Sequence, residues 1–230
     1  MIRPVITLRR IRILVDVDTQ QDYLLADGKA CVEDHRHILS NIRRLVAWAR
    51  LKNIRMISTA RVNPPGQAGL DFCVAGTPGM RKVPYTIRHR HVRFEADGCT
   101  DLPRDILRRF DQIIVNKRCD DPFDEPRADR ILSELRVTEF VVFGVPTETA
   151  VKKTVLGLLA RRRNVTVLTD ATGWCDREAA QIALRQMEAK GATLTTTRTA
   201  LGVSHLQCVG VCDCPVCRAR QKQSTLRAGA

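Results

Sequence analysis

The stretch that decides the fold lies between residues 139 and 173 and reads EFVVFGVPTETAVKKTVLGLLARRRNVTVLTDATG. Its first five residues are almost wholly apolar, as in a strand that is covered on both faces. Four apolar residues then recur at helical spacing: Val151, Val155, Leu158 and Leu159. Residues 165–169 form a second β-branched run. A strand, a helix and a strand in this order predict two parallel strands joined by a crossover helix.

The same alternation extends along most of the 230 residues. Further strands are predicted at 11–17, 54–59, 112–116 and 193–196, and further helices at 32–52, 126–136 and 176–190. Residues 60–100 hold many Gly and Pro, which predicts a long excursion over the site. The predicted fold class is α/β, a three-layer α/β/α domain with a six-stranded, mainly parallel sheet. Such sheets carry their sites at the carboxyl ends of the strands.

The chain is predicted to hold one domain over residues 1–203 and a tail over 204–230 that is rich in Cys and then basic. No apolar run approaches the ~20 residues that cross a bilayer, and the first residues do not read as a secretory signal. The nine cysteines are an odd number. Scattered thiols of this kind suit a reducing compartment, so the sequence predicts a cytoplasmic protein without a membrane partner.

The formal net charge is +13. The basic residues are spread along the chain, with local clusters at 88–91 and 161–163. No aromatic residues interleave with them as a base-stacking platform requires. We therefore expect a small-molecule ligand in preference to a nucleic acid.

Five segments at or near predicted strand ends resemble one family. They read LVDVDTQQDY (14–23), FCVAGTPG (72–79), VNKRCDDPFDE (115–125), FGVPTETAVKKTVLGLLARR (143–162) and VTVLTDATG (165–173). In this order they resemble the isochorismatase-like superfamily of cysteine hydrolases, which includes nicotinamidases, N-carbamoylsarcosine amidases and isochorismatases. The resemblance covers roughly residues 10 to 200 and implies that superfamily's α/β fold and a homo-oligomer.

The resemblance assigns catalytic roles to three positions. Asp18 matches the Asp that acts as a base toward a thiol, and Lys117 matches the Lys that holds charge beside it. Asp16 is a competing candidate whose spacing to the following amide and acidic residues fits less well. Ala150 occupies the position of the nucleophilic Cys, and a methyl group cannot attack a carbonyl. The thioester route is therefore closed at this position.

The resemblance also assigns a substrate pocket. Its expected lining residues are Gln20, Arg61, Phe72, Phe123, Pro146 and Thr147. Pro146 lies where the family has a cis peptide next to an oxyanion donor, so we expect a cis Val145–Pro146 bond and one donor fewer. Metal-binding members carry an Asp-x-His and a further His where this chain has Arg61, Asn63 and Phe72. These residues predict no cofactor at the active site, and Arg61 favours an anionic ligand.

The tail carries a cluster of four cysteines, Cys208, Cys212, Cys214 and Cys217. Four thiolates suit tetrahedral zinc, so the cluster predicts a structural zinc site, with His205 as an alternative ligand. The single residue between Cys212 and Cys214 is awkward for two ligands of one ion. The other interpretation is a tail whose thiols bind metal only adventitiously.

Two functions remain open from the sequence. The first is a hydrolase without a thiol, for which the isochorismate-cleaving members give a precedent, since they lack the Cys and their Asp is thought to act as an acid. The second is a pseudoenzyme that binds a small molecule or serves as a scaffold. A buried Asp18–Lys117 salt bridge with a purely structural role is the third interpretation of the same residues.

Overall fold

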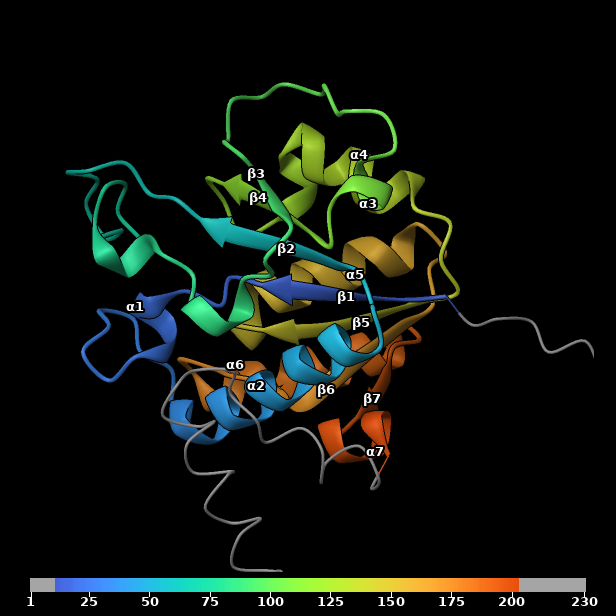
Figure 1. The fold of residues 1–230 in the computed structure, drawn as a ribbon. Coiled ribbons are helices and arrows are strands. Elements are labelled where there is room, and N and C mark those ends of the chain that lie inside the picture. Colours follow the sequence, from blue (N-terminus) through green and yellow to red (C-terminus); the bar gives the residue numbers. More distant parts are fainter. Residues whose placement is uncertain (1–10, 203–230) are drawn as a thin grey trace, which may run out of the picture.

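The computed structural model describes residues 11–202 and contains one twisted sheet between two layers of helices (Figure 1). The predicted tail and its cysteine cluster lie outside the described residues. The seven strands follow the order β3-β4-β2-β1-β5-β6-β7, and each neighbouring pair is parallel. They are β1 (Arg12–Val17), β2 (Met56–Arg61), β3 (His91–Phe94), β4 (Gln112–Lys117), β5 (Glu139–Gly144), β6 (Val165–Thr172) and β7 (Thr193–Thr195).

The prediction of six strands is wrong by one. The additional strand, β3, lies at the edge of the sheet and pairs only with β4 over the residues His91 to Phe94. It is four residues long and none of its side chains is fully buried. A short edge strand needs no continuous apolar run, so the alternating basic residues before it masked the strand in the sequence.

Helices cover both faces of the sheet (Figure 1). They are α1 (Gln21–Leu24), α2 (His35–Leu51), α3 (Ile106–Arg109), α4 (Pro126–Glu134), α5 (Lys152–Ala160), α6 (Arg177–Ala189) and α7 (Thr197–Leu201). Short helical turns complete the fold at η1 (Pro78–Met80), η2 (Pro84–Thr86), η3 (Pro122–Asp124) and η4 (Thr147–Val151). The strand face that includes Ile13 and Val15 packs against α4, α5 and α6. The opposite face, which includes Leu14, packs against α2. No helix within residues 11–202 is long and apolar enough to cross a membrane.

The close approach of β5 to β1 explains the glycine that ends β5, just before the elbow formed by residues 145–151. Gly144 has a φ of +126°, and a Cβ built there would lie 1.9 Å from the carbonyl oxygen of Val17. Any larger residue would therefore push the end of β5 away from β1. This glycine allows the elbow that follows to meet the end of β1, where Asp18 lies.

The helix α6 begins at a capping residue that offers a test of the local structure. The carboxylate of Asp176 accepts a hydrogen bond of 3.0 Å from the backbone N–H of Ala179. We expect Asp176→Ala to lower the free energy of unfolding by about 1 kcal/mol, because the N–H would lose its partner. Urea denaturation measures the change, and Asp176→Asn, which can still accept the bond, should recover most of it. An unchanged stability in Asp176→Ala would contradict this capping role.

Candidate functional site

The centre of the candidate site is an ion pair between Asp18 and Lys117. The Lys117 Nζ lies 2.6 Å from the Asp18 Oδ2. Both side chains are buried, with exposed fractions of 1% for Asp18 and 0% for Lys117. Asp18 follows directly after β1 and adopts a left-handed φ of +49°, a conformation that Asp tolerates better than most residues. At this separation of the Lys117 Nζ and the Asp18 Oδ2, two opposite charges attract each other strongly.

Asp18 and Lys117 follow or end strands that are not neighbours in the sheet. Lys117 ends β4, and β2 lies between β4 and β1. The Lys117 side chain reaches past β2, and its ammonium also donates to the carbonyl oxygens of Cys119 (3.0 Å) and Asp120 (3.2 Å). From β2, the Thr59 hydroxyl donates to the second Asp18 oxygen at 2.7 Å. Every ammonium proton and both carboxylate oxygens therefore have a partner.

A second buried ion pair joins Lys82 to Asp16. Their charged atoms lie 3.0 Å apart, and both side chains have an exposed fraction of 0%. Lys82 also donates to the carbonyl oxygen of Thr59 at 3.0 Å, while Asp16 accepts from the hydroxyls of Thr19 and Ser58. Burial lowers the pKa of Lys82, and the Asp16 carboxylate opposes that shift. Asp16, the competing catalytic candidate, is thus held in a pair of its own.

The elbow after β5 places Ala150 at the same edge of the sheet. The Val145–Pro146 peptide is cis. A π-helical turn follows, in which the Val151 N–H donates to the Pro146 carbonyl at 3.0 Å. Ala150 is fully buried in this turn. The N–H and the hydroxyl of Thr147 both donate to the Gly173 carbonyl, at 2.7 and 2.8 Å, so neither is free to bind a ligand in this arrangement.

Arg61 ends β2 and lies beside the central pair. Its guanidinium forms an ion pair of 2.8 Å with Asp120 and donates to the Asn63 Oδ1 at 2.7 Å. Asp120 was not identified in the sequence. Because its carboxylate faces Arg61, the charge that Arg61 adds to the site is compensated within the protein. An anionic ligand would have to share Arg61 with Asp120 or displace it.

Tyr23, Phe72 and Cys73 complete the surroundings of the centre. The rings of Tyr23 and Phe72 lie 5.6 Å apart. Burial raises the pKa of the Tyr23 hydroxyl, and the negative charge of Asp18 raises it further. Burial likewise raises the pKa of the Cys73 thiol, with further contributions from Asp18 and Asp22. The sequence analysis did not single out Tyr23, although it ends the quoted segment LVDVDTQQDY.

Two of the expected pocket residues have mainly structural contacts. The Gln20 amide donates to the carbonyl oxygens of Arg61 (2.7 Å) and Met80 (2.8 Å) and accepts from the Arg61 N–H at 2.7 Å. It therefore fastens the end of β2 to the end of η1. The Phe123 ring lies under the Arg161 guanidinium at 3.8 Å, against α5.

The residues at the family's metal position do not fit a metal ion. Arg61 is a cation and Phe72 has no ligand atom. The Asn63 amide is occupied on both sides, because it accepts from Arg61 and donates to the Phe72 carbonyl at 2.7 Å. No three His, Cys, Asp or Glu side chains gather as a metal site anywhere between residues 11 and 202.

Parallel sheets with helices on both faces and charged groups beyond the strand ends are typical of α/β enzymes and of proteins built on their folds. Within this class the assignment is specific. The chain belongs to the isochorismatase family, since residues 12–199 match the Isochorismatase domain. This confirms the family resemblance of the sequence motifs.

Solved structures with the same fold come from several organisms. A Pyrococcus horikoshii pyrazinamidase in complex with zinc has 22% sequence identity and a TM-score of 0.64, covering 81% of this chain and 99% of its own. An isochorismatase-like hydrolase of Alkaliphilus metalliredigens has 19% identity and a TM-score of 0.63, covering 83% and 96%. The MAR1 ribonuclease of Caenorhabditis elegans has 21% identity and a TM-score of 0.58, covering 89% and 91%. No curated protein matches the sequence.

Proposed function

We propose that this chain is a hydrolase that works without a thiol on a small substrate with an anionic group. The observation that carries the proposal is the Asp18–Lys117 pair, 2.6 Å apart and buried beside the elbow of a hydrolase-family fold. Removing two charges from water costs several kcal/mol per ion before pairing repays it. The pair lies at the carboxyl edge of a parallel sheet, which is where this fold class places its catalytic groups.

The proposed chemistry needs one carboxylate that exchanges a proton. Asp18 takes a proton from a water molecule while the water oxygen attacks the electrophilic carbon of the substrate. The resulting carboxylic acid returns the proton to the leaving group, so the net reaction adds one water across one bond. The Lys117 ammonium stabilises the Asp18 carboxylate whenever that carboxylate is charged. Arg61, released from Asp120, would bind the anionic group of the substrate.

A second candidate function is ligand binding without turnover. The observation that favours it is the complete set of partners of Asp18 and Lys117, which leaves neither group free for a substrate. The Arg61–Asp120 ion pair adds to this, as does a methyl group at the nucleophile position. In this role the Asp18–Lys117 pair would hold the strand ends together, and the pocket would bind a ligand without converting it.

A substrate panel with one conservative variant separates the two candidates. Purified protein is incubated with small anionic esters, amides and enol ethers, and products are followed by mass spectrometry. Under the first proposal, Asp18→Asn should reduce turnover by about 10²–10⁴-fold. Asp27→Asn, the same change at an exposed carboxylate, should leave turnover unchanged. Circular dichroism confirms that both variants are folded.

Each outcome of this experiment bears on one candidate. Turnover that survives Asp18→Asn would overturn the hydrolytic role of Asp18. Saturable binding of a panel compound without any turnover would replace the first proposal by the second. Neither turnover nor binding over the whole panel would overturn both proposals.

A further inference from the structure

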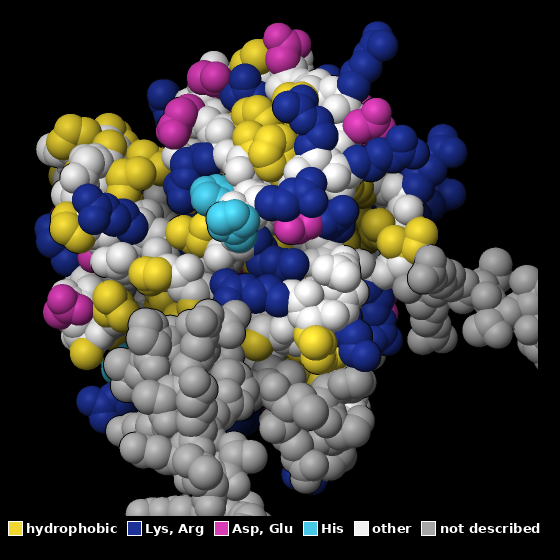
Figure 2. All heavy atoms as spheres, in the orientation of Figure 1, with side chains coloured by type: hydrophobic (Ala, Val, Ile, Leu, Met, Phe, Trp, Pro, Cys, Tyr) yellow, Lys and Arg dark blue, Asp and Glu magenta, His cyan; other side chains and the backbone are white. Residues whose placement is uncertain are grey.

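A basic groove lies on the face of the molecule seen in Figure 2, and neither Asp18 nor Lys117 lines it. Its volume is about 990 Å³, which lies in the range of small-molecule sites. In Figure 2 dark blue Lys and Arg atoms surround a cyan His cluster in the middle of this face. The cationic and imidazole side chains that line the groove are Arg50, Arg81, Lys82, Arg88, His89, His91 and Arg93.

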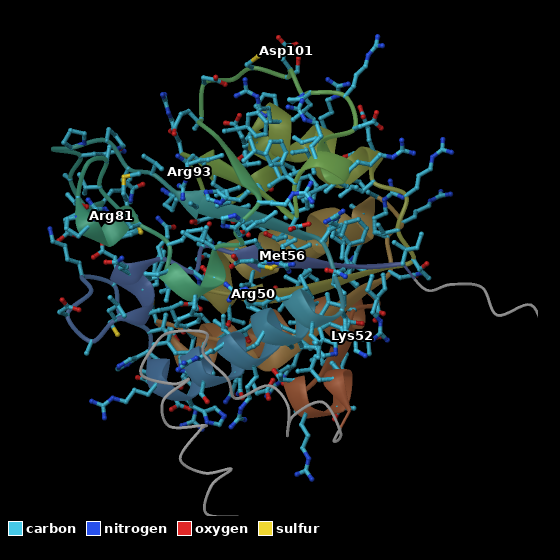
Figure 3. All side chains as sticks on the ribbon, in the orientation of Figure 1. Arg50, Lys52, Met56, Arg81, Arg93 and Asp101 are labelled. Carbon is cyan, nitrogen blue, oxygen red and sulfur yellow. The ribbon has the colours of Figure 1, made fainter. Side chains whose placement is uncertain are left out.

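The arginines of the groove come from separate segments. Figure 3 labels Arg50 at the end of α2, Arg81 directly after η1 and Arg93 in β3. Arg50 and Arg93 each donate only to neutral groups, Arg50 to the carbonyls of Tyr85 and Ile87, and Arg93 to the Asn116 Oδ1. The Arg81 guanidinium has no hydrogen bond or ion pair within the described part of the chain. None of these three guanidinium groups therefore faces a carboxylate in an ion pair.

The negative charges near the groove are already committed. Asp111 is the one acidic residue in its lining, and its carboxylate pairs with Arg55. Lys82, at the floor, is paired with Asp16. The lining as a whole therefore carries an excess of positive charge that the described residues do not neutralise. An excess of this kind favours anions through both Coulomb attraction and charge-assisted hydrogen bonds.

Two arginines of the groove, the buried Arg88 and the partly buried Arg93, have lowered pKa values. Burial lowers the pKa of Arg88, and the charges of Arg50 and Arg55 lower it further against the opposing charge of Asp111. Burial also lowers the pKa of Arg93, with Glu95 opposing. A bound anion would oppose both shifts, because it adds negative charge beside these guanidinium groups.

We propose that this groove binds a small organic phosphate that carries two or more phosphate groups. Guanidinium forks match phosphate oxygens in bidentate geometry. Arg50 on α2, Arg81 after η1 and Arg93 on β3 together offer more cations than one anionic group would occupy. The apolar lining residues Met80, Pro84 and Ile87 offer a contact for the carbon skeleton of the ligand. The lining contains no Phe, Tyr or Trp ring on which the bases of a nucleic acid could stack.

Isothermal titration calorimetry with the full chain tests the proposal. The probes are inorganic tripolyphosphate, adenosine diphosphate, citrate and a single-stranded RNA of about twelve nucleotides, at an ionic strength of about 0.15 M. We expect saturable binding of both phosphates. The double variant R50Q/R81Q should raise their Kd by about tenfold or more, a loss of about 1.4 kcal/mol. The matched control R177Q/R185Q, which removes two exposed arginines from α6, should change Kd less than about twofold.

Several results would overturn the proposal. One is the absence of saturable phosphate binding, and another is an equal loss in both double variants, which would indicate a general charge effect. Citrate that binds as tightly as tripolyphosphate would replace the phosphate ligand by a polycarboxylate. RNA that binds more tightly than both phosphates, and is lost in R50Q/R81Q, would replace the small molecule by a nucleic acid.

Discussion

Lys117→Met is expected to lower the free energy of unfolding by about 3–5 kcal/mol, which is the cost of leaving one charge of a buried pair alone. Methionine has nearly the length of lysine and keeps the apolar part of the side chain, so the variant removes the charge with little change in packing. The Asp18 carboxylate would then keep only the Thr59 hydroxyl as a partner. Urea denaturation followed by circular dichroism measures the loss.

A second variant separates the charge from the loss of the Lys117 hydrogen bonds. The double variant Asp18→Asn/Lys117→Met carries no charge at the centre, and asparagine tolerates the left-handed conformation at position 18. Its loss of unfolding free energy should be smaller than the sum of the losses in the two single variants, because each single variant leaves one buried charge without its partner. Lys52→Met, at an exposed lysine after α2, should stay within about 0.5 kcal/mol of the unmodified protein. A loss below about 1 kcal/mol in Lys117→Met would contradict a buried ion pair.

Thiol-dependent hydrolysis of amides is expected to be absent. Ala150, at the position that the family resemblance assigns to the nucleophile, has a buried methyl group. Cys73 is fully buried, and burial raises the pKa of its thiol. Burial together with Glu148 raises the pKa of Cys175 to about 11, so that thiol is almost wholly protonated at neutral pH. Neither of these two thiols is therefore poised to attack a carbonyl.

The expected rescue is also limited, for a reason that lies in the elbow. Pro146 has no N–H, and the Thr147 N–H is directed to the Gly173 carbonyl. Loss of one oxyanion donor costs about 10²–10³ in rate. Ala150→Cys alone should therefore recover little activity, and Ala150→Cys with Pro146→Ala should recover more. Thr149→Cys is the control, since a thiol at the neighbouring position leaves the turn in a different direction from one at position 150.

Ammonia release from a panel of amides, with and without iodoacetamide, checks this expectation. Release by the unmodified protein that iodoacetamide abolishes would overturn it and would identify another cysteine as the nucleophile. Release by Thr149→Cys equal to that of Ala150→Cys would show that the position of the thiol does not matter, and so would contradict the assignment of position 150.

The sequence predicted those parts of the fold that local chemistry determines. The β-branched runs and the apolar spacing of residues 139–173 correspond to β5, α5 and β6 as expected. The edge strand β3 has no such signal, because its pairing with β4 is formed across a long loop and its side chains stay partly exposed. Periodicity reports burial, and an edge strand with little burial leaves little periodicity to read.

The residues of the candidate site also fall into two groups, those that the sequence pattern indicated and those that it did not. Asp18 and Lys117 stand in motifs at strand ends, and the structure brings them together. Lys82 and Asp120 lie in irregular segments, where no spacing rule indicates which way a side chain points. Their partners, Asp16 and Arg61, lie on the strands β1 and β2. Contacts of this kind depend on the folded path of the loops, so the sequence pattern alone could not supply them.

Thr59 joins the two buried ion pairs, with its hydroxyl on Asp18 and its carbonyl oxygen on Lys82. A mutation that neutralises one of the four charged side chains leaves its partner as an unpaired charge in the low-polarity interior. If these charges were lost in evolution by single substitutions, each first substitution would therefore produce a destabilised intermediate protein. The simplest viable route exchanges both members of a pair together, which ties the histories of positions 16 and 82, and of 18 and 117, to each other.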